Sequence, residues 1–427
     1  MTQAFNLSQL ANGANTSGQL NASNYLYNQV PVANGGTALS SAGATGNMLI
    51  ASSASAYSTV KMPTFSYRNR IINGDMRIDQ RNAGASVSTA SNSSAYTLDR
   101  WIIEYSQFSK FTLQQNAGSV TPPTGYTNYL GVTSSSAYSV SFGDYFLLEQ
   151  RVEGFNSADL AWGTASAASI TVSFWVRSSL TGTFGGAIRN QAGTRSYPFS
   201  FTISAANTWE QKTVTIPGDT TGTWLTTNGI GLRLGLSLGM GSTYTATGGA
   251  WAAGNFLTPT GATSVVGTNG ATFYITGVQL EAGSVATAFD VRDYGRELMM
   301  CQRYYEKSFS QSTAPNNNGT GLGQIAFAVA WGGSLGGKTT IRFAVVKRAT
   351  PTLTRYGDAS GSYGYLTSGI LPTTQTTYTY NVNLLPQPST DAEFNLDNQA
   401  TQTTLFCVLG GWAAQGAAVP CACFRLH

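Results

Sequence analysis

The sequence predicts an all-β protein built around an antiparallel β-sandwich. Many strand-length stretches alternate apolar with polar residues, as strands with one buried face do, and turns of Gly, Ser, Thr and Asn separate them. Glycine supplies 48 of the 427 residues, which suits a chain with many tight turns. Charged residues make up only 10% of the chain, against ~25% in an average soluble protein. The polar strand faces are therefore lined mainly by hydroxyl groups.

The strand pattern is clearest in the middle of the chain. Val172, Phe174 and Val176 alternate with polar residues and fall on one face. The stretch 273–280 also alternates, but it changes face once at Gly277, which predicts a β-bulge there. Further strands are expected at 209–216 and through Leu232, Leu234, Leu236 and Leu238. We expect these strands to share one sandwich domain.

One helix is expected, at 293–307. Tyr294, Leu298, Cys301 and Tyr305 recur there at helical spacing and form one apolar stripe. The stripe is narrow and short, so it is compatible with a coiled coil without requiring one. Because a single copy offers this stripe no evident cover, the four residues are candidates for a contact between copies.

The two ends of the chain differ in composition. Residues 1–62 are rich in Asn, Ala, Gly and Ser and have too little apolar surface for a core, so we expect them to order on other copies or on a partner. The Asn34-Gly35-Gly36 sequence predicts a turn, and 47–51 predicts a short strand. Residues 324–427 return to strand patterns, clearest at 325–331, 340–346 and 404–409.

Charge and cysteine content exclude several classes of protein. The net charge of +4 comes without any run of Lys and Arg, so we expect no nucleic-acid partner. The N-terminus lacks the basic and apolar stretches of a signal peptide, and no window of ~18 apolar residues predicts membrane insertion. The cysteines do not form a secreted disulfide framework, and we interpret them as buried thiols rather than metal ligands. They are Cys301, Cys407, Cys421 and Cys423. No cofactor or metal is expected.

Catalysis is not expected either. The only histidine, His427, is the last residue, and no Gly-x-Ser-x-Gly motif lies between a strand and a helix. A glycoside hydrolase needs two carboxylates ~5–9.5 Å apart. Asp391, Glu393 and Asp397 come closest to such a pair in sequence, and we interpret them as turn and capping residues.

Arginines and aspartates cluster between residues 68 and 100. Such a cluster could bind an anion, but we interpret it as an internal network in which guanidinium groups bind carboxylates around the apolar anchor Trp101. Its members are Arg68, Arg70, Arg77, Arg81, Arg100, Asp75, Asp79 and Asp99.

Three blocks of sequence occur in a characteristic order. They are YRNRIINGDMRIDQRN at 67–82, FYITGVQLEAGSVATAF at 273–289 and YGRELMMCQRYY at 294–305. Together they resemble the tail-fibre and receptor-binding proteins of phages, over about residues 68–306.

Two shorter stretches resemble the same family. VANGGT at 32–37 is similar to an element near the N-termini of tail fibres, and KRATPTLT at 347–354 is similar to one that follows the helix block. Leu353 stands where the family more often has valine, which keeps the apolar face.

The resemblance implies a jelly roll of the carbohydrate-binding-module type, a homotrimer, and a place in the virion tail after assembly in the host cytoplasm. It divides the chain into a tail-attachment segment (1–62), the jelly roll (63–290), a linking helix (291–307) and a C-terminal β tip (308–427). The implied partners are tail or baseplate proteins for the N-terminal segment, and a host surface glycan or outer-membrane receptor. The implied function is multivalent adhesion to the host.

Two aromatic groups could contact the receptor. Tyrosine offers a flat aromatic surface and a hydroxyl group for hydrogen bonds. Two pairs of tyrosines lie among Gly, Ser and Thr in the tip, and the two members of each pair would share one face of an extended strand. These tip tyrosines are Tyr363, Tyr365, Tyr378 and Tyr380. The competing platform is Trp224 and Trp251, in Gly- and Thr-rich loops of the jelly roll. We favour the tip because the distal end of a fibre meets the host first.

Two other functions remain open. One is a polysaccharide-degrading tail spike, although such spikes usually show the repeated rungs of a β-helix and this sequence has no rung period. The other is a purely structural tail or baseplate component.

Overall fold

A computed structural model describes most of the centre of the chain. Residues 68–90, 94–316, 343–349 and 351 are described with their side chains, and short strands elsewhere by their backbone. The chain forms two compact units, Met1–Arg68 and Asn69–His427. The predicted divisions at 62/63, 290/291 and 307/308 stay predictions.

Unit 1 contains a two-stranded hairpin. β1 (Asn47–Ser53) pairs antiparallel with β2 (Ala56–Lys61). The strand expected at 47–51 is confirmed. The predicted turn at Asn34-Gly35-Gly36 lies outside the described residues.

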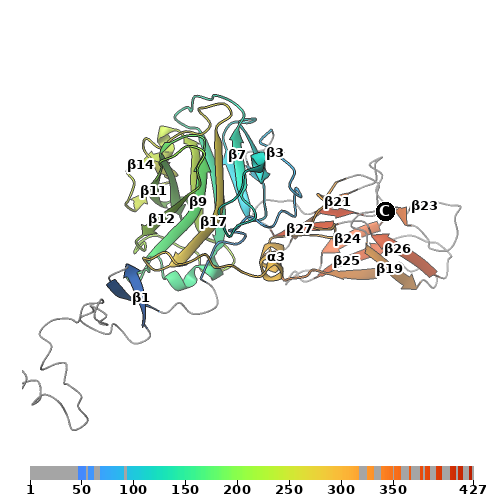
Figure 1. The fold of residues 1–427 in the computed structure, drawn as a ribbon. Coiled ribbons are helices and arrows are strands. Elements are labelled where there is room, and N and C mark those ends of the chain that lie inside the picture. Colours follow the sequence, from blue (N-terminus) through green and yellow to red (C-terminus); the bar gives the residue numbers. More distant parts are fainter. Residues whose placement is uncertain are drawn as a thin grey trace, which may run out of the picture. The chain divides into compact units, whose positions relative to one another are not determined.

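The larger unit contains an antiparallel sandwich of the jelly-roll kind, and Figure 1 shows β12, β9 and β17 side by side in one of its sheets. Among the described residues one sheet has seven strands, in the order β15 (Ala252–Ala253), β11 (Arg195–Ile203), β10 (Gly182–Arg189), β13 (Ile230–Met240), β8 (Tyr145–Glu153), β5 (Trp101–Tyr105) and β4 (Ser94–Tyr96). The other has six, in the order β12 (Glu210–Ile216), β9 (Ile170–Ser178), β17 (Thr272–Ala282), β7 (Leu130–Ser134), β6 (Phe111–Gln115) and β3 (Val87–Ser88).

The predicted alternation places the core between these sheets. Val172, Phe174 and Val176 of β9 are buried, as are the four leucines of β13. Phe174 meets Phe201 of the opposite sheet edge-to-face, with ring centroids 5.0 Å apart. The alternating strands of the sequence are thus the two inner faces of one sandwich.

The bulge predicted in β17 is confirmed. The pairing of β17 with β9 shifts between Thr276 and Gln279, and Gly277 has a φ of 60°. A Cβ at Gly277 would lie 2.5 Å from the hydroxyl oxygen of Tyr126. Glycine therefore meets two demands at this position, a left-handed backbone and a close side chain.

Short elements cover part of the seven-stranded sheet. β14 (Thr245–Ala246) and β16 (Thr258–Pro259) pair in parallel, and β16 packs against β10, β11 and β13. The connections also contain short 3-10 turns, η2 (Ala117–Ser119), η3 (Gly154–Asn156), η4 (Ala158–Leu160) and η5 (Ser242–Tyr244).

The first residues of the sandwich are tied to its last strand. The Asn69 side chain donates to the carbonyl of Val278 at 3.1 Å and accepts from the amide of Leu280 at 3.1 Å. Arg292, just beyond the sandwich, donates to the carbonyl of Ile71 at 3.1 Å. A Cβ at Gly74 would lie 2.2 Å from the Val278 carbonyl oxygen. The chain therefore enters and leaves the sandwich through one compact junction.

The helix is shorter than predicted. α3 (Tyr294–Gln302) begins at the cap Asp293, whose carboxylate accepts from the Arg296 amide at 2.8 Å. The expectation of a helix to residue 307 is wrong, because residues 305–307 form strand β18. Within the part of the chain that the structure describes, α3 is the only α-helix.

The four stripe residues do not share one exposed face. Cys301 is fully buried and Tyr305 is 5% exposed, both within their own chain. Leu298 packs against the buried cluster around Cys301, and Tyr294 is 46% exposed. The premise that one copy cannot cover this stripe is therefore wrong for Cys301 and Tyr305, whereas Tyr294 stays exposed. The homotrimer itself stays a prediction.

The C-terminal segments are also strands. The expected strands at 325–331 and 404–409 correspond to a pair, β19 and β26, whereas the strand expected at 340–346 ends at Arg342. The four-stranded sheet contains β18 (Tyr305–Lys307), β27 (Trp412–Gly416), β21 (Pro351–Tyr356) and β28 (Cys423–Arg425), with β21 and β28 parallel. The other pairings join β19 (Ile325–Ala330) with β26 (Thr404–Leu409), β25 (Asp391–Leu396) with both β20 (Lys338–Arg342) and β24 (Tyr380–Leu384), and β22 (Tyr365–Leu366) with β23 (Thr376–Thr377).

Candidate functional site

Three tryptophans converge at one end of the sandwich. The ring centroids of Trp162 lie 4.6 Å from Trp224 and 5.4 Å from Trp251, and those of Trp224 and Trp251 lie 5.5 Å apart. All three contacts are edge-to-face, the geometry that aromatic quadrupoles favour. Trp162 is buried, whereas Trp224 and Trp251 are half-buried. The structure thus joins the two predicted tryptophans, and we call the three residues the tryptophan cluster.

Hydrogen bonds to backbone carbonyls of two loops, 161–169 and 217–229, fix the cluster. Each indole N–H donates to a carbonyl: Trp162 to Ala168 at 2.7 Å, Trp224 to Thr221 at 3.2 Å and Trp251 to Pro217 at 2.8 Å. These bonds hold the rings in place without using their faces. The cluster therefore presents preorganised aromatic surface, which costs little side-chain entropy on binding.

Trp162 was missed by the sequence argument. It follows η4 and precedes Gly163 and Thr164, so its Gly- and Thr-containing surroundings match those of Trp224 and Trp251. This local signal was present in the sequence, but nothing in the sequence indicated that three distant loops bring the tryptophans together.

An ion pair lies beside the cluster. Arg195 donates from Nε and Nη2 to the two carboxylate oxygens of Asp219, at 2.7 and 2.6 Å. Burial favours a higher pKa for Asp219, but the hydrogen bonds from Arg195 and Thr221 and the charge of Arg195 hold that pKa below its usual value. The Arg195 guanidinium also lies 5.9 Å from the Trp251 ring centroid. Aromatic surface and polar groups are thus adjacent, the combination that a sugar ring requires.

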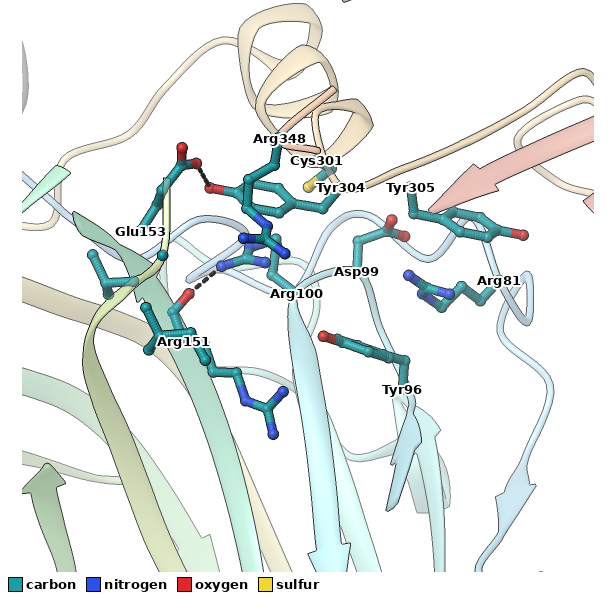
Figure 2. A pocket seen from close by; sticks show the side chains of 13 residues that line it. Arg81, Tyr96, Asp99, Arg100, Arg151, Glu153, Cys301, Tyr304, Tyr305 and Arg348 are labelled. Atoms are coloured by element: carbon teal, nitrogen blue, oxygen red, sulfur yellow. Dashed lines mark hydrogen bonds between the residues drawn. The ribbon is translucent and has the colours of Figure 1, made fainter. Parts of the chain in front are cut away.

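A hollow lies where the end of α3 meets the sandwich, and Figure 2 shows its lining. Arg81 lies between the rings of Tyr96 and Tyr305, at 4.5 and 3.8 Å from their centroids. Arg100 lies 3.5 Å from the ring centroid of Tyr304 and donates to the carbonyl of Arg151. Cation–π contacts of this kind fix the guanidinium planes in a desolvated site.

Glu153 anchors this joint. Its carboxylate accepts from Arg303 Nε at 2.9 Å and Nη2 at 2.6 Å, and from the Tyr304 hydroxyl at 2.6 Å. Nearby, burial raises the pKa of Asp99 to about 6, despite the charge of Arg81 and hydrogen bonds from Gln80. The full set of hydrogen bonds on Glu153 indicates a structural link rather than a reactive group.

The predicted arginine–aspartate network is present with partly different partners. Arg70 binds Asp159 through two hydrogen bonds, at 2.8 and 2.6 Å, and Arg77 pairs with Asp75. Asp79 accepts from the backbone amide of Gly84 at 2.7 Å. By contrast, Arg81 and Arg100 contact tyrosine rings, which sequence proximity to aspartates could not reveal.

Several predicted residues cannot be placed at a site. Tyr363 and Tyr378 lie outside the described residues, and only the backbone is described where Tyr365 begins β22 and Tyr380 begins β24. The candidate carboxylates Asp391 and Glu393 share a face of β25 by register, and Asp397 lies outside the described residues. The tip tyrosines therefore stay candidates.

The one described cysteine side chain is a buried thiol. Cys301 is fully buried and unpaired, and burial raises the pKa of its thiol well above the usual range. The described residues contain no group of His, Cys, Asp or Glu arranged to hold a metal ion. No helix of the described residues is long and apolar enough to span a membrane.

Comparisons with known proteins give structural likeness only. No family model matches the sequence, and no curated protein does. The enzymatically active domain of tailspike protein 4 of bacteriophage CBA120 is 11% identical over 46% of this chain, with a TM-score of 0.27. This chain spans only 22% of that tailspike chain.

Two structures described as sugar-binding are similar to this chain at the same low level. A putative sugar-binding protein of Bacteroides thetaiotaomicron is 12% identical over 51% of this chain and 100% of its own, with a TM-score of 0.29. The module TmCBM61, solved with β-1,4-galactotriose, is 10% identical over 51% of this chain and 99% of its own, with a TM-score of 0.26. At this level of similarity the comparisons carry no statement about the activity of this chain.

Proposed function

We propose that this chain is a phage tail fibre that attaches the virion to a host surface glycan by multivalent adhesion. The observation that carries the proposal is the convergence of Trp162, Trp224 and Trp251 on one end of the sandwich, with two half-buried rings beside the Arg195–Asp219 pair. The sequence blocks that resemble tail fibres supply the biological context. Glycan binding is proposed to occur without cleavage, and a reducing-end assay on host polysaccharide tests this point.

The tryptophan cluster is the site to test first. Replacing an anchor aromatic at an interface costs ~2 kcal/mol or more, or roughly 30-fold in affinity. We therefore expect Trp224→Ala and Trp251→Ala each to weaken binding to host cells and to a glycan array. Trp209→Ala is the matched control, because Trp209 is also half-buried and donates its indole N–H to a carbonyl, that of Thr121 at 2.9 Å.

The tip tyrosines provide the competing outcome. Adsorption that survives the Trp224 and Trp251 variants but fails when Tyr363 and Tyr365, or Tyr378 and Tyr380, are replaced by alanine places the receptor contact in the tip. Loss of binding in the Trp209→Ala control would show only that the sandwich is damaged.

The same proposal includes assembly as a parallel homotrimer and docking on tail or baseplate proteins through residues 1–62. The distinct composition of that segment supports the docking role. Light scattering should give three chains of 45.0 kDa per particle, and a monomer would contradict the trimer. Deletion of residues 1–62 should leave a folded remainder that no longer joins tails.

A further inference from the structure

A row of arginines crosses the outer face of the seven-stranded sheet. Arg151 of β8 pairs in register with Arg233 of β13, which in turn pairs with Arg189 of β10. Neighbouring strands are ~4.8 Å apart, so the row spans about 10 Å. Phe146, Leu148 and Val152 of β8 belong to the core, and Arg151 has the opposite parity. The row therefore lies on the face turned away from the core.

Two carboxylates neutralise the row only in part. Glu149 is fully buried and accepts from Arg151 Nε at 2.9 Å, Arg189 Nη2 at 2.5 Å and Arg233 Nη1 at 3.2 Å. Glu104 pairs with Arg151 and lies 3.8 Å from Arg233. Burial favours a higher pKa for Glu149, but the charges of Arg189, Arg233 and Arg151 hold that pKa below its usual value. Three guanidinium groups thus face two carboxylates, which leaves one positive charge in excess.

The arginine row also has unused donors. The Nε atoms of Arg189 and Arg233 are buried and have no hydrogen-bond partner. Burial lowers the pKa of Arg233. The charge of Glu149 raises this pKa, but the charges of Arg151 and Arg189 offset part of that effect. A buried donor without a partner destabilises the fold until an acceptor reaches it. An anion placed on the exposed part of the row would supply the missing negative charge next to these guanidinium groups.

The row is covered on one side and partly exposed on the other. The Asn255 side chain, from the segment that contains β15 and β16, accepts from Arg189 Nη1 at 2.6 Å. By contrast, the side chains of Arg151, Arg233 and Glu104 keep 12, 17 and 21% of their surface exposed. The accessible part of the row is therefore Arg151 and Arg233, with Glu104 at its edge.

We propose that this face binds the anionic group of an acidic glycan, a carboxylate or a phosphate, through Arg151 and Arg233. The inference rests on the proposed glycan-binding function and deepens it by naming the chemical class of the sugar. Guanidinium groups suit both anions, because their planar fork matches two oxygens at once. Glu104 opposes the bound anion, so its charge limits affinity.

The test compares sugars that differ only in charge. Calorimetry at low salt would measure the full-length protein with oligogalacturonate, with the same oligosaccharide after carboxyl reduction, and with inorganic phosphate as competitor. We expect the acidic sugar to bind at least about tenfold more tightly than the reduced one, the magnitude of one charge-assisted hydrogen bond. Displacement by phosphate shows that the row accepts a phosphate group, whereas binding of the uronate without such displacement assigns it to carboxylates.

Two variants of opposite charge keep the proposal falsifiable. Arg233→Gln should remove the preference for the acidic sugar, and Glu104→Gln should increase it. Lys212→Gln is the control, because Lys212 pairs with Glu210 on the other sheet and should leave the preference unchanged. Equal affinity for the acidic and reduced sugars, or a preference unaffected by Glu104→Gln in a folded protein, overturns the inference. A different result contradicts the proposed function: neutral-glycan binding and cell adsorption that are unchanged in the Trp224 and Trp251 variants.

Discussion

Replacing Glu153 by glutamine should loosen the joint between the sandwich and the segment that follows it. The Glu153 side chain is 1% exposed and binds Arg303 and Tyr304 through three hydrogen bonds. Glutamine keeps the shape but removes the charge and turns one acceptor oxygen into a donor. The Arg303 guanidinium then faces a donor where it had an acceptor.

The expected loss of stability follows from how deeply Glu153 and Arg303 are buried. Breaking a buried ion pair by removing one partner costs about 3–5 kcal/mol. Arg303 keeps 30% of its side chain exposed, so water recovers part of its solvation and the lower end applies. About 3 kcal/mol lowers the melting temperature by roughly 10 °C in a domain of this size. Asp159→Asn is the matched control, because Asp159 also binds an arginine bidentately but its side chain is 64% exposed.

Urea denaturation followed by circular dichroism would measure both variants. We expect Asp159→Asn to cost less, about 1–2 kcal/mol, because the Asp159 carboxylate is largely solvated and the buried Arg70 keeps its hydrogen bond to the Asn156 carbonyl at 2.7 Å. If Glu153→Gln costs as little as Asp159→Asn, the claim that burial makes this link strong is refuted.

Three further predictions concern the sandwich. Burial raises the pKa of Asp99 from 3.8 to about 6, so the folded state holds this proton at a pH where the unfolded state has released it. Relative to Asp99→Asn, the wild type should lose roughly 2.4 kcal/mol of stability between pH 4 and pH 7, and parallel urea-denaturation profiles of the two proteins would contradict this. Gly277→Ala should cost ~1–3 kcal/mol in the same assay, because the new Cβ meets Tyr126 in a left-handed backbone. Phe174→Ala should cost about 3–5 kcal/mol, and a melting temperature within 2 °C of wild type, on the order of experimental scatter, would contradict its burial in the core.

The strands of the sandwich were predictable because their signal is local. Alternation around Phe174 and the face change at Gly277 each depend on a few consecutive residues, and both are confirmed. The end of the helix was not predictable in the same way. Tyr305 keeps helical spacing in the sequence, but its backbone pairs with Gln415 of β27 about a hundred residues later, and this pairing ends any helix.

The candidate sites show the same limit. Trp224 and Trp251 were identified by their surroundings, yet their contact with Trp162 depends on three loop paths that no local pattern encodes. The arginine row was missed because Arg151 and Arg233 lie on strands far apart in sequence. At Cys301 the sequence could not tell which surface covers the side chain, because a buried position on a helix looks the same whether its own chain or another copy covers it. In the structure its own chain covers it.

The single junction through which the chain enters and leaves the sandwich determines how that domain carries mechanical force. Tension applied between residues 68 and 293 would load the bonds of Asn69 to Val278 and Leu280, and that of Arg292 to Ile71. The long strands on either side of the core would lie outside this load path. Tension along the chain would therefore break the bonds of the junction before it could shear the sheets. The tryptophan cluster and the arginine row would keep their structure while the flanking segments are stretched.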